Sequence, residues 1–183
     1  MEVGGPDFET PGPIIEAGKR ALDSGASHYT PAAGIIELRR AIAGDYRKRF
    51  GVSLDPARIL VTPGSSGALQ LVMSILVNPG EGVMMADPGY PCNRNFVHLV
   101  SGVPVTIPVS ADTGYQLTAE IVEQEWRDDI RAVMVASPSN PTGTLLNRGE
   151  LERIHRVVTS RGAVWSVDEI YQGLVYDGKP FSA

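Results

Sequence analysis

The segment that most constrains this chain runs from Ala132 to Gly143, with the sequence AVMVASPSNPTG. Its first half is apolar and rich in valine, and its second half consists of serine, proline, asparagine, threonine and glycine. A short apolar run that ends in turn residues is typical of a buried strand in a parallel sheet. Ligands of open α/β sheets bind just beyond the carboxyl ends of such strands. Residues 139–143 therefore mark the expected position of a binding site.

Length and composition are those of a globular, water-soluble protein. The 183 residues are 43% hydrophobic and 20% charged, and the net charge is −5. We therefore expect no basic surface for nucleic acid or for an anionic membrane. No apolar stretch reaches the roughly 18 residues that a membrane span requires, and the N-terminus lacks the regions of a signal peptide. The single cysteine, Cys92, excludes an internal disulfide and favours a reducing, cytoplasmic location.

Apolar strands alternate with helices along the chain. Hydrophobic periodicity and turn residues predict helices at 13–24, 35–50, 68–76, 93–101, 118–125 and 148–160. Strands are predicted at 58–62, 83–86, 103–109, at the apolar start of 132–143, and at 163–168. Strands separated by helices imply parallel pairing with right-handed crossovers. The predicted fold class is α/β, a three-layer α/β/α arrangement around a mainly parallel sheet.

A glycine- and serine-rich loop, Gly64-Ser65-Ser66-Gly67, lies between a predicted strand and a predicted helix. Exposed N–H groups and the positive end of the helix dipole favour an anion at such a position, and the serine hydroxyls add donors. A second interpretation remains open, in which Gly64 makes the turn and a serine caps the helix. The loop has neither the Gly-Lys-Ser/Thr of a Walker motif nor three spaced glycines, so a mononucleotide-like or vitamin phosphate is favoured over ATP or NAD.

Other strand ends carry an aromatic ring and a carboxylate. Tyr90 lies between two prolines and is placed to stack on a planar ligand, although simple packing is the plainer interpretation. Asp168 ends an apolar strand, with Tyr171 three residues later. Asn140, Asp168 and Tyr171 together would offer donors and acceptors in one crevice, since a half-buried carboxylate needs a partner. The alternative is that Asp168 caps the next helix.

Six motifs then occur in a recognisable order. They are Tyr29–Gly34 (YTPAAG) with Leu38-Arg39, Val61–Leu69 (VTPGSSGAL), Asn78–Gly80 (NPG), Asp87–Pro91 (DPGYP), Ser139–Gly143 (SNPTG) and Asp168–Tyr171 (DEIY). With them, the chain resembles the class I/II (fold type I) pyridoxal-5′-phosphate-dependent aminotransferases over essentially all of its length. One such motif would be weak, whereas six in the family's order are specific.

The resemblance implies roles for eight residues. Gly64, Ser65 and Ser66 would hold the cofactor phosphate, Tyr90 would stack on the pyridine ring, Asn140 and Tyr171 would hydrogen-bond its 3-oxygen, and Asp168 would pair with its protonated nitrogen. Tyr29 would reach the phosphate of the neighbouring subunit's cofactor, which implies a homodimer. From the resemblance and the tight Asn-Pro turn, we also predict that the Asn140–Pro141 bond is cis.

The resemblance also implies an organisation and an activity. Residues 1–27 would be a lead-in segment and residues 28–183 a partial, incomplete large domain that binds pyridoxal 5′-phosphate. The reaction would transfer an amino group between two small molecules, an amino acid and a 2-oxo acid. We expect an exposed sheet edge, because later strands of the family's sheet are not among these residues.

The family's Schiff-base lysine and its later arginines have no counterpart in this sequence. The three lysines are Lys19, Lys48 and Lys179, and none occupies the matching position, so we expect the lysine to lie beyond Ala183 and this chain alone to be inactive. His28, His98 and His155 show no metal-ligand spacing, and no metal site is expected.

Other activities use the same cofactor cradle. A C–S β-lyase or a cyclopropane-forming synthase would differ only in substrate contacts. The sensor domain of a transcription regulator shares the fold and would require a basic DNA-binding segment upstream. A non-catalytic relative would lack the lysine altogether.

Overall fold

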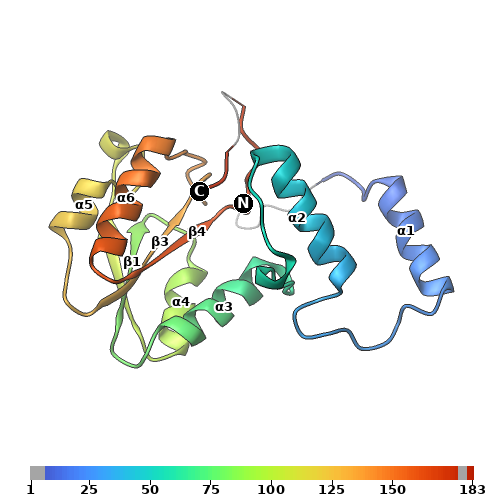
Figure 1. Ribbon diagram of the computed structural model, residues 1–183. Helices are drawn as coiled ribbons and strands as arrows, with labels where there is room; N and C mark the ends of the chain where they lie inside the picture. The colour runs from blue at the N-terminus through green and yellow to red at the C-terminus, as the bar shows by residue number, and fades with distance from the viewer. Residues whose placement is uncertain (1–6, 177–180) are drawn as a thin grey trace.

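The alternation of apolar strands and helices produces a parallel sheet between two helical layers. The computed structural model describes residues 7–176 and 181–183. In these ranges the strands are β1 (Gly82–Asp87), β2 (Val103–Pro108), β3 (Ile130–Ala136) and β4 (Val164–Asp168), in the spatial order β2-β1-β3-β4. All three strand pairs are parallel. The predicted α/β class is confirmed (Figure 1).

Six α-helices occur in the described residues. They are α1 (Gly12–Asp23), α2 (Ile36–Phe50), α3 (Gly64–Leu76), α4 (Cys92–Leu99), α5 (Ala119–Gln124) and α6 (Arg148–Ser160), with short 3₁₀ turns at Pro56–Arg58 and Ala111–Thr113. Each was predicted from the sequence, with bounds that differ by no more than four residues. No helix in the described ranges is long and apolar enough to cross a bilayer.

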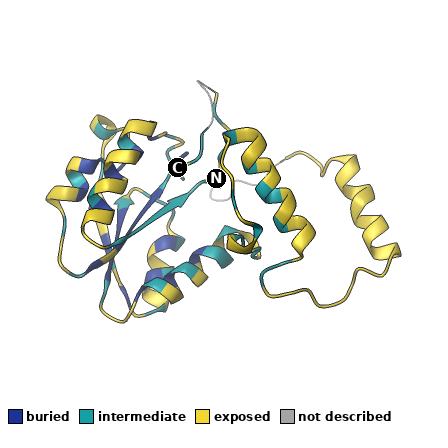
Figure 2. Cartoon of the chain, in the orientation of Figure 1, coloured by how far each residue is buried: buried dark blue, intermediate teal, exposed yellow. Residues whose placement is uncertain are grey.

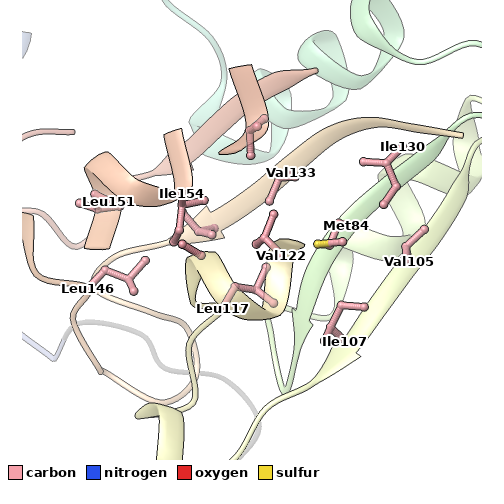
Figure 3. Close-up of a cluster of buried hydrophobic side chains, with 13 residues drawn as sticks. Met84, Val105, Ile107, Leu117, Val122, Ile130, Val133, Leu146, Leu151 and Ile154 are labelled. Carbon is pink, nitrogen blue, oxygen red and sulfur yellow. The ribbon is translucent and has the colours of Figure 1, made fainter. Parts of the chain in front are cut away.

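The sheet has an apolar core on each face, because side chains alternate along every strand. Met84 on β1 and Val133 on β3 pack with α5 and α6, where Ile154 and Val158 are fully buried (Figure 3). Val83 and Met85 point to the opposite face and pack with α3 and α4, where Met73 is fully buried. The two clusters establish the three predicted layers and fix the sheet rigidly beneath its loops.

The register brings the carboxyl ends of the strands to one edge. Ala136 on β3 pairs with Asp168 on β4, and the N–H of Ser137 donates to the carbonyl of Asp168 at 3.0 Å. Met85 on β1 pairs with Met134 on β3. The loops that follow β1, β3 and β4 therefore start side by side, as expected for a ligand site of an open α/β sheet.

The first helices lie outside this core. Helix α1 has no buried residue, and its apolar side chains Ile14 and Leu22 are exposed. It projects from the body of the molecule, and Figure 2 shows it exposed along its whole length. Helix α2 is likewise without a fully buried residue, but Arg39 anchors it through a hydrogen bond from its Nε to the Pro56 carbonyl at 2.9 Å.

One predicted strand is wrong. Residues 58–62 do not join the sheet; Pro56–Arg58 forms a 3₁₀ turn and the following residues are extended. The N–H of Val61 donates instead to the carbonyl of Ala33 at 3.1 Å, and Leu60 is 63% exposed. Val61 instead docks this segment on the Tyr29–Gly34 loop, because its side chain also lies against Gly34. Strand β4 has β3 as its one strand partner among the described residues and forms one edge of the sheet, where its residues are half-buried.

Candidate functional site

The N-terminus of α3 is an uncapped helix end. Gly64 starts the helix with φ of +71°, a conformation that glycine adopts without steric cost. No side chain caps this terminus, and the Thr62 hydroxyl donates to the Gly64 carbonyl at 2.8 Å. The interpretation in which Ser65 or Ser66 caps the helix is therefore wrong. The first-turn N–H groups and the dipole are left for an anion.

Tyr90 connects the loop after β1 to this helix end. Tyr90 is half-buried, and the side chains of Cys92 and Ser66 lie near its hydroxyl. The neighbouring Cys92 thiol raises the pKa of the Tyr90 phenol, whereas the Ser66 side chain lowers it. Tyr171 raises the same pKa by charge repulsion. Tyr90 therefore lies near Ser66 at the start of α3, and it lines a small cavity together with Asn140.

Asn140 and Tyr171 line one pocket of about 380 Å³. The Asn140–Pro141 peptide bond is cis, as predicted, and Asp87–Pro88 and Ser137–Pro138 are cis as well. The loop turns at Gly143, whose φ is +69° and whose N–H donates to the Ser139 carbonyl at 2.8 Å. The turn presents Asn140 beside the loop that follows β4.

Asp168 is half-buried at the end of β4. Its Oδ1 accepts a hydrogen bond from the N–H of Ile170 at 3.0 Å. This is the capping role that the sequence left open, although it closes a turn and not a helix. A carboxylate has several acceptor positions, so this bond leaves capacity for a cationic partner.

Tyr29 is not brought to the site of its own chain. Its side chain is 106% exposed, and the loop around it has no buried residue. Of the eight residues predicted from the sequence, the remaining seven lie at the carboxyl edge of the sheet or at the start of α3.

The sequence did not single out two buried amides that support these loops. Gln116 is 4% exposed and its Nε2 donates to the carbonyls of Ala136 at 3.1 Å and Thr144 at 2.9 Å, joining the end of β3 to the far side of the Asn140 turn. Asn93, on α4, is 8% exposed and lines a small cavity next to Tyr90 and Asn140. The local sequence gives no signal for either residue, because Asn93 is followed by Arg94 and Asn95 and Gln116 lies in the mixed segment 114–118.

Fold and site together define a class: a parallel α/β protein whose strand-end loops surround an anion-favouring helix N-terminus. The family model for aminotransferase class I and II matches residues 1–183. The chain belongs to this family, whose members depend on pyridoxal 5′-phosphate.

Individual relatives agree with the family. The chain is 39% identical over 180 residues to valine–pyruvate aminotransferase of Mycobacterium tuberculosis, covering 98% of this chain and 46% of that protein. It is 36% identical over 183 residues to (5-formylfuran-3-yl)methyl phosphate transaminase of Methanocaldococcus jannaschii, covering 100% of this chain and 46% of the relative. The chain thus spans about half the length of the curated relatives it matches.

Solved structures share the fold. An aminotransferase from Mycobacterium tuberculosis superposes with a TM-score of 0.93 at 39% identity, covering 99% of this chain and 46% of that one. Aspartate aminotransferase from Thermus thermophilus with maleate gives a TM-score of 0.94 at 34% identity, covering 98% of this chain and 47% of that one.

The residues present fit the family's cofactor. The uncapped start of α3 suits a phosphate, the half-buried ring of Tyr90 suits a planar heterocycle, and Asn140 with Tyr171 supplies polar groups at one pocket. These are the three parts of a phosphorylated hydroxypyridine: an anion, a ring face and a polar ring oxygen.

Proposed function

We propose that the enzyme to which this chain contributes transfers an amino group between an amino acid and a 2-oxo acid with pyridoxal 5′-phosphate. The observation that carries the proposal is that Asn140 and Tyr171 line one pocket, while Tyr90 shares a small cavity with Asn140 and lies near Ser66 at the uncapped start of α3. Relatives named for transamination with valine and pyruvate support the reaction class.

The chain's own residues would bind and orient the cofactor. The N–H groups of Gly64, Ser65 and Ser66 and the two hydroxyls would bind the phosphate, and Tyr90 would cover one ring face. Asn140 and Tyr171 would hydrogen-bond the 3-oxygen. Asp168 would hold a proton on the ring nitrogen through a charge-assisted bond. Bound pyridoxal 5′-phosphate supplies an electron sink for the substrate's α-carbon, and the ring-nitrogen proton strengthens that sink.

The 183-residue chain alone would not complete this reaction. The two lysines in the described ranges, Lys19 and Lys48, lie exposed on α1 and α2, and Lys19 pairs with Glu16 at 2.8 Å. Neither lines the pocket of Asn140 and Tyr171. Lys179 falls outside the described residues. A proton shuttle at the substrate's α-carbon would therefore have to come from elsewhere in the enzyme.

A homodimer with shared sites is part of the proposal. Tyr29 is fully exposed and so is available to a second subunit. The exposed apolar side chains of Ile14, Ile15 and Leu22 on α1 would be covered by the same contact. Sedimentation of the complete enzyme tests the dimer, and a monomer at micromolar concentration would contradict it.

The proposal also includes a cytoplasmic location for the enzyme, supported by the single free cysteine, Cys92.

The cofactor roles are tested by titrating the chain with pyridoxamine 5′-phosphate, which binds without a covalent bond to lysine. The substitution Asp168→Asn should weaken binding about tenfold or more, because a hydrogen bond between charged partners is lost. Asp128→Asn, at an exposed position, is the matched control and should leave the affinity unchanged. Equal affinities for both variants would contradict the role of Asp168.

The reaction class is tested on the complete enzyme. Amino transfer from an amino acid to a 2-oxo acid, without release of ammonia, is the expected result. Release of ammonia and a 2-oxo acid from a cysteine thioether would instead indicate a β-lyase. Transamination by the isolated 183-residue chain would contradict the predicted inactivity.

A further inference from the structure

A small, partly open cavity lies between two loops of the site, at the carboxyl ends of β1 and β3. Its volume is about 20 Å³, which is room for one water molecule and too little for a larger ligand. Tyr90, Asn93, Gln116, Ser139 and Asn140 contribute to its lining, with Met85 and Met134 on the sheet side. None of the lining residues is charged, so the cavity suits a neutral occupant.

One residue of the lining carries a buried polar atom that has no partner in the described part of the chain. The Oδ1 of Asn93 is buried and accepts no hydrogen bond within the described residues. The backbone N–H of Asn93 donates to the Tyr90 carbonyl at 3.1 Å, which fixes the residue next to the Tyr90 loop. Buried polar groups in folded proteins are nearly always paired with protein or with ordered water.

Gln116 cannot be the missing donor. Both hydrogens of its Nε2 are used, for the carbonyls of Ala136 and Thr144. A water molecule meets the requirement in either orientation of the Asn93 carboxamide, because water both donates and accepts. The polar neighbours in the lining supply its further hydrogen bonds, and buried waters make about three.

We propose that this cavity holds one ordered water that links Asn93 to the Asn140 loop, and that Asn93 is a positioning residue for the cofactor contact of Asn140. The water fixes the distance between the Tyr90 loop and the Asn140 loop, so the ring face and the 3-oxygen contact keep a constant spacing. The positioning role rests on the proposed function, whereas the water site does not.

The test uses two leucine variants on one helix. Asn93→Leu removes the partner of the water and fills its space. Asn95→Leu makes the same chemical change at an exposed position of α4 and is the matched control. A crystal structure of each variant and of the unchanged chain, without cofactor, shows whether the water is present. We expect it in the unchanged chain and in Asn95→Leu and not in Asn93→Leu.

Binding of pyridoxamine 5′-phosphate and of inorganic phosphate then separates positioning from general damage. Asn93→Leu should weaken pyridoxamine 5′-phosphate binding about tenfold, the effect of one ordinary hydrogen bond, and leave phosphate binding unchanged. It should also shift the pH at which the 3-hydroxyl of the bound ligand ionises, read from its absorption spectrum. A merely structural asparagine would leave that pH where it is.

The outcomes are distinct. A dry cavity in the unchanged chain, or a side chain that pairs with the Asn93 Oδ1, overturns the water site. A water that is present in the unchanged chain, together with equal ligand affinity and ionisation pH in both leucine variants, overturns the positioning role. Failure of the unchanged chain to bind pyridoxamine 5′-phosphate contradicts the proposed function and the role that rests on it, and the crystallographic result for the water stands apart from it.

Discussion

Replacing Gln116 by leucine removes the side chain that joins the end of β3 to the Asn140 loop. Its Nε2 donates two hydrogen bonds, of 3.1 Å to Ala136 and 2.9 Å to Thr144, from a side chain that is 4% exposed. Each such bond contributes roughly 0.5–1.5 kcal/mol. The Thr144 carbonyl keeps the N–H of Ser139 as a donor, at 2.9 Å, so only the Ala136 carbonyl can be left unpaired, which adds about 1 kcal/mol. Leucine has a similar volume, so no large cavity is left. We expect a loss of about 2–3 kcal/mol in the free energy of unfolding.

Urea denaturation followed by circular dichroism measures this loss. With a slope of about 2 kcal/mol per molar urea, the midpoint should fall by roughly 1 M with no change in slope. Gln124→Leu, at an exposed position at the end of α5, is the matched control and should stay within about 0.5 kcal/mol of the unchanged chain. If the two variants had the same midpoint, the argument that Gln116 anchors this loop would be refuted.

Two further predictions concern stability. Gly34→Ala should lower the thermal midpoint and reduce the free energy of unfolding by about 1–3 kcal/mol, because φ at Gly34 is +90° and a Cβ would lie 2.6 Å from the Val61 side chain. Gly44→Ala on α2, where a Cβ meets open space, should raise the free energy of unfolding by about 0.5–1 kcal/mol. If Gly34→Ala were the more stable variant, the packing described would be contradicted. Hydrogen bonds from the N–H and Nδ2 of Asn78 lower the pKa of Glu81 below its usual 4.5, so the stabilisation is present above that pH and is lost as the pH falls through the folded-state pKa. Urea midpoints of the unchanged chain and Glu81→Gln should therefore differ at neutral pH and converge in acid, and a pH-independent difference would count against the assignment.

The elements that the sequence predicted correctly are those with a periodic apolar pattern. Helix α6 was located to the residue, because its buried Leu151, Ile154 and Val158 repeat at helical spacing. The segment 58–62 has the composition of a strand but pairs with a loop through Val61. Short apolar runs do not specify their partner, since that depends on which distant segment lies beside them.

The site residues that follow the carboxyl ends of the strands could be predicted from the sequence, because ligands of open α/β sheets bind there. Asn140, Asp168 and Tyr171 were expected in one crevice; Asn140 and Tyr171 line one pocket, and Asp168 is not among its lining residues. Gln116 and Asn93 were not foreseen, because their roles depend on contacts with residues such as Ala136 and Asn140 that are distant in sequence. A single amide in the sequence carries no sign of which backbone groups it will meet.

The strand order has a consequence for synthesis on the ribosome. After β1, strand β2 is added on one side, and β3 and then β4 are added in turn on the other. The connection from β1 to β3 contains α4, β2 and α5, whereas α6 is the one helix between β3 and β4, so each strand pairs with a strand that has already been made. Because residues emerge at about 5–20 per second, far more slowly than short segments find neighbouring strands, the sheet is able to grow outward in the order of translation. Strand β4 is then the last of the four strands to join the sheet, and the loop that follows Asp168 takes its place only after β4 has paired with β3.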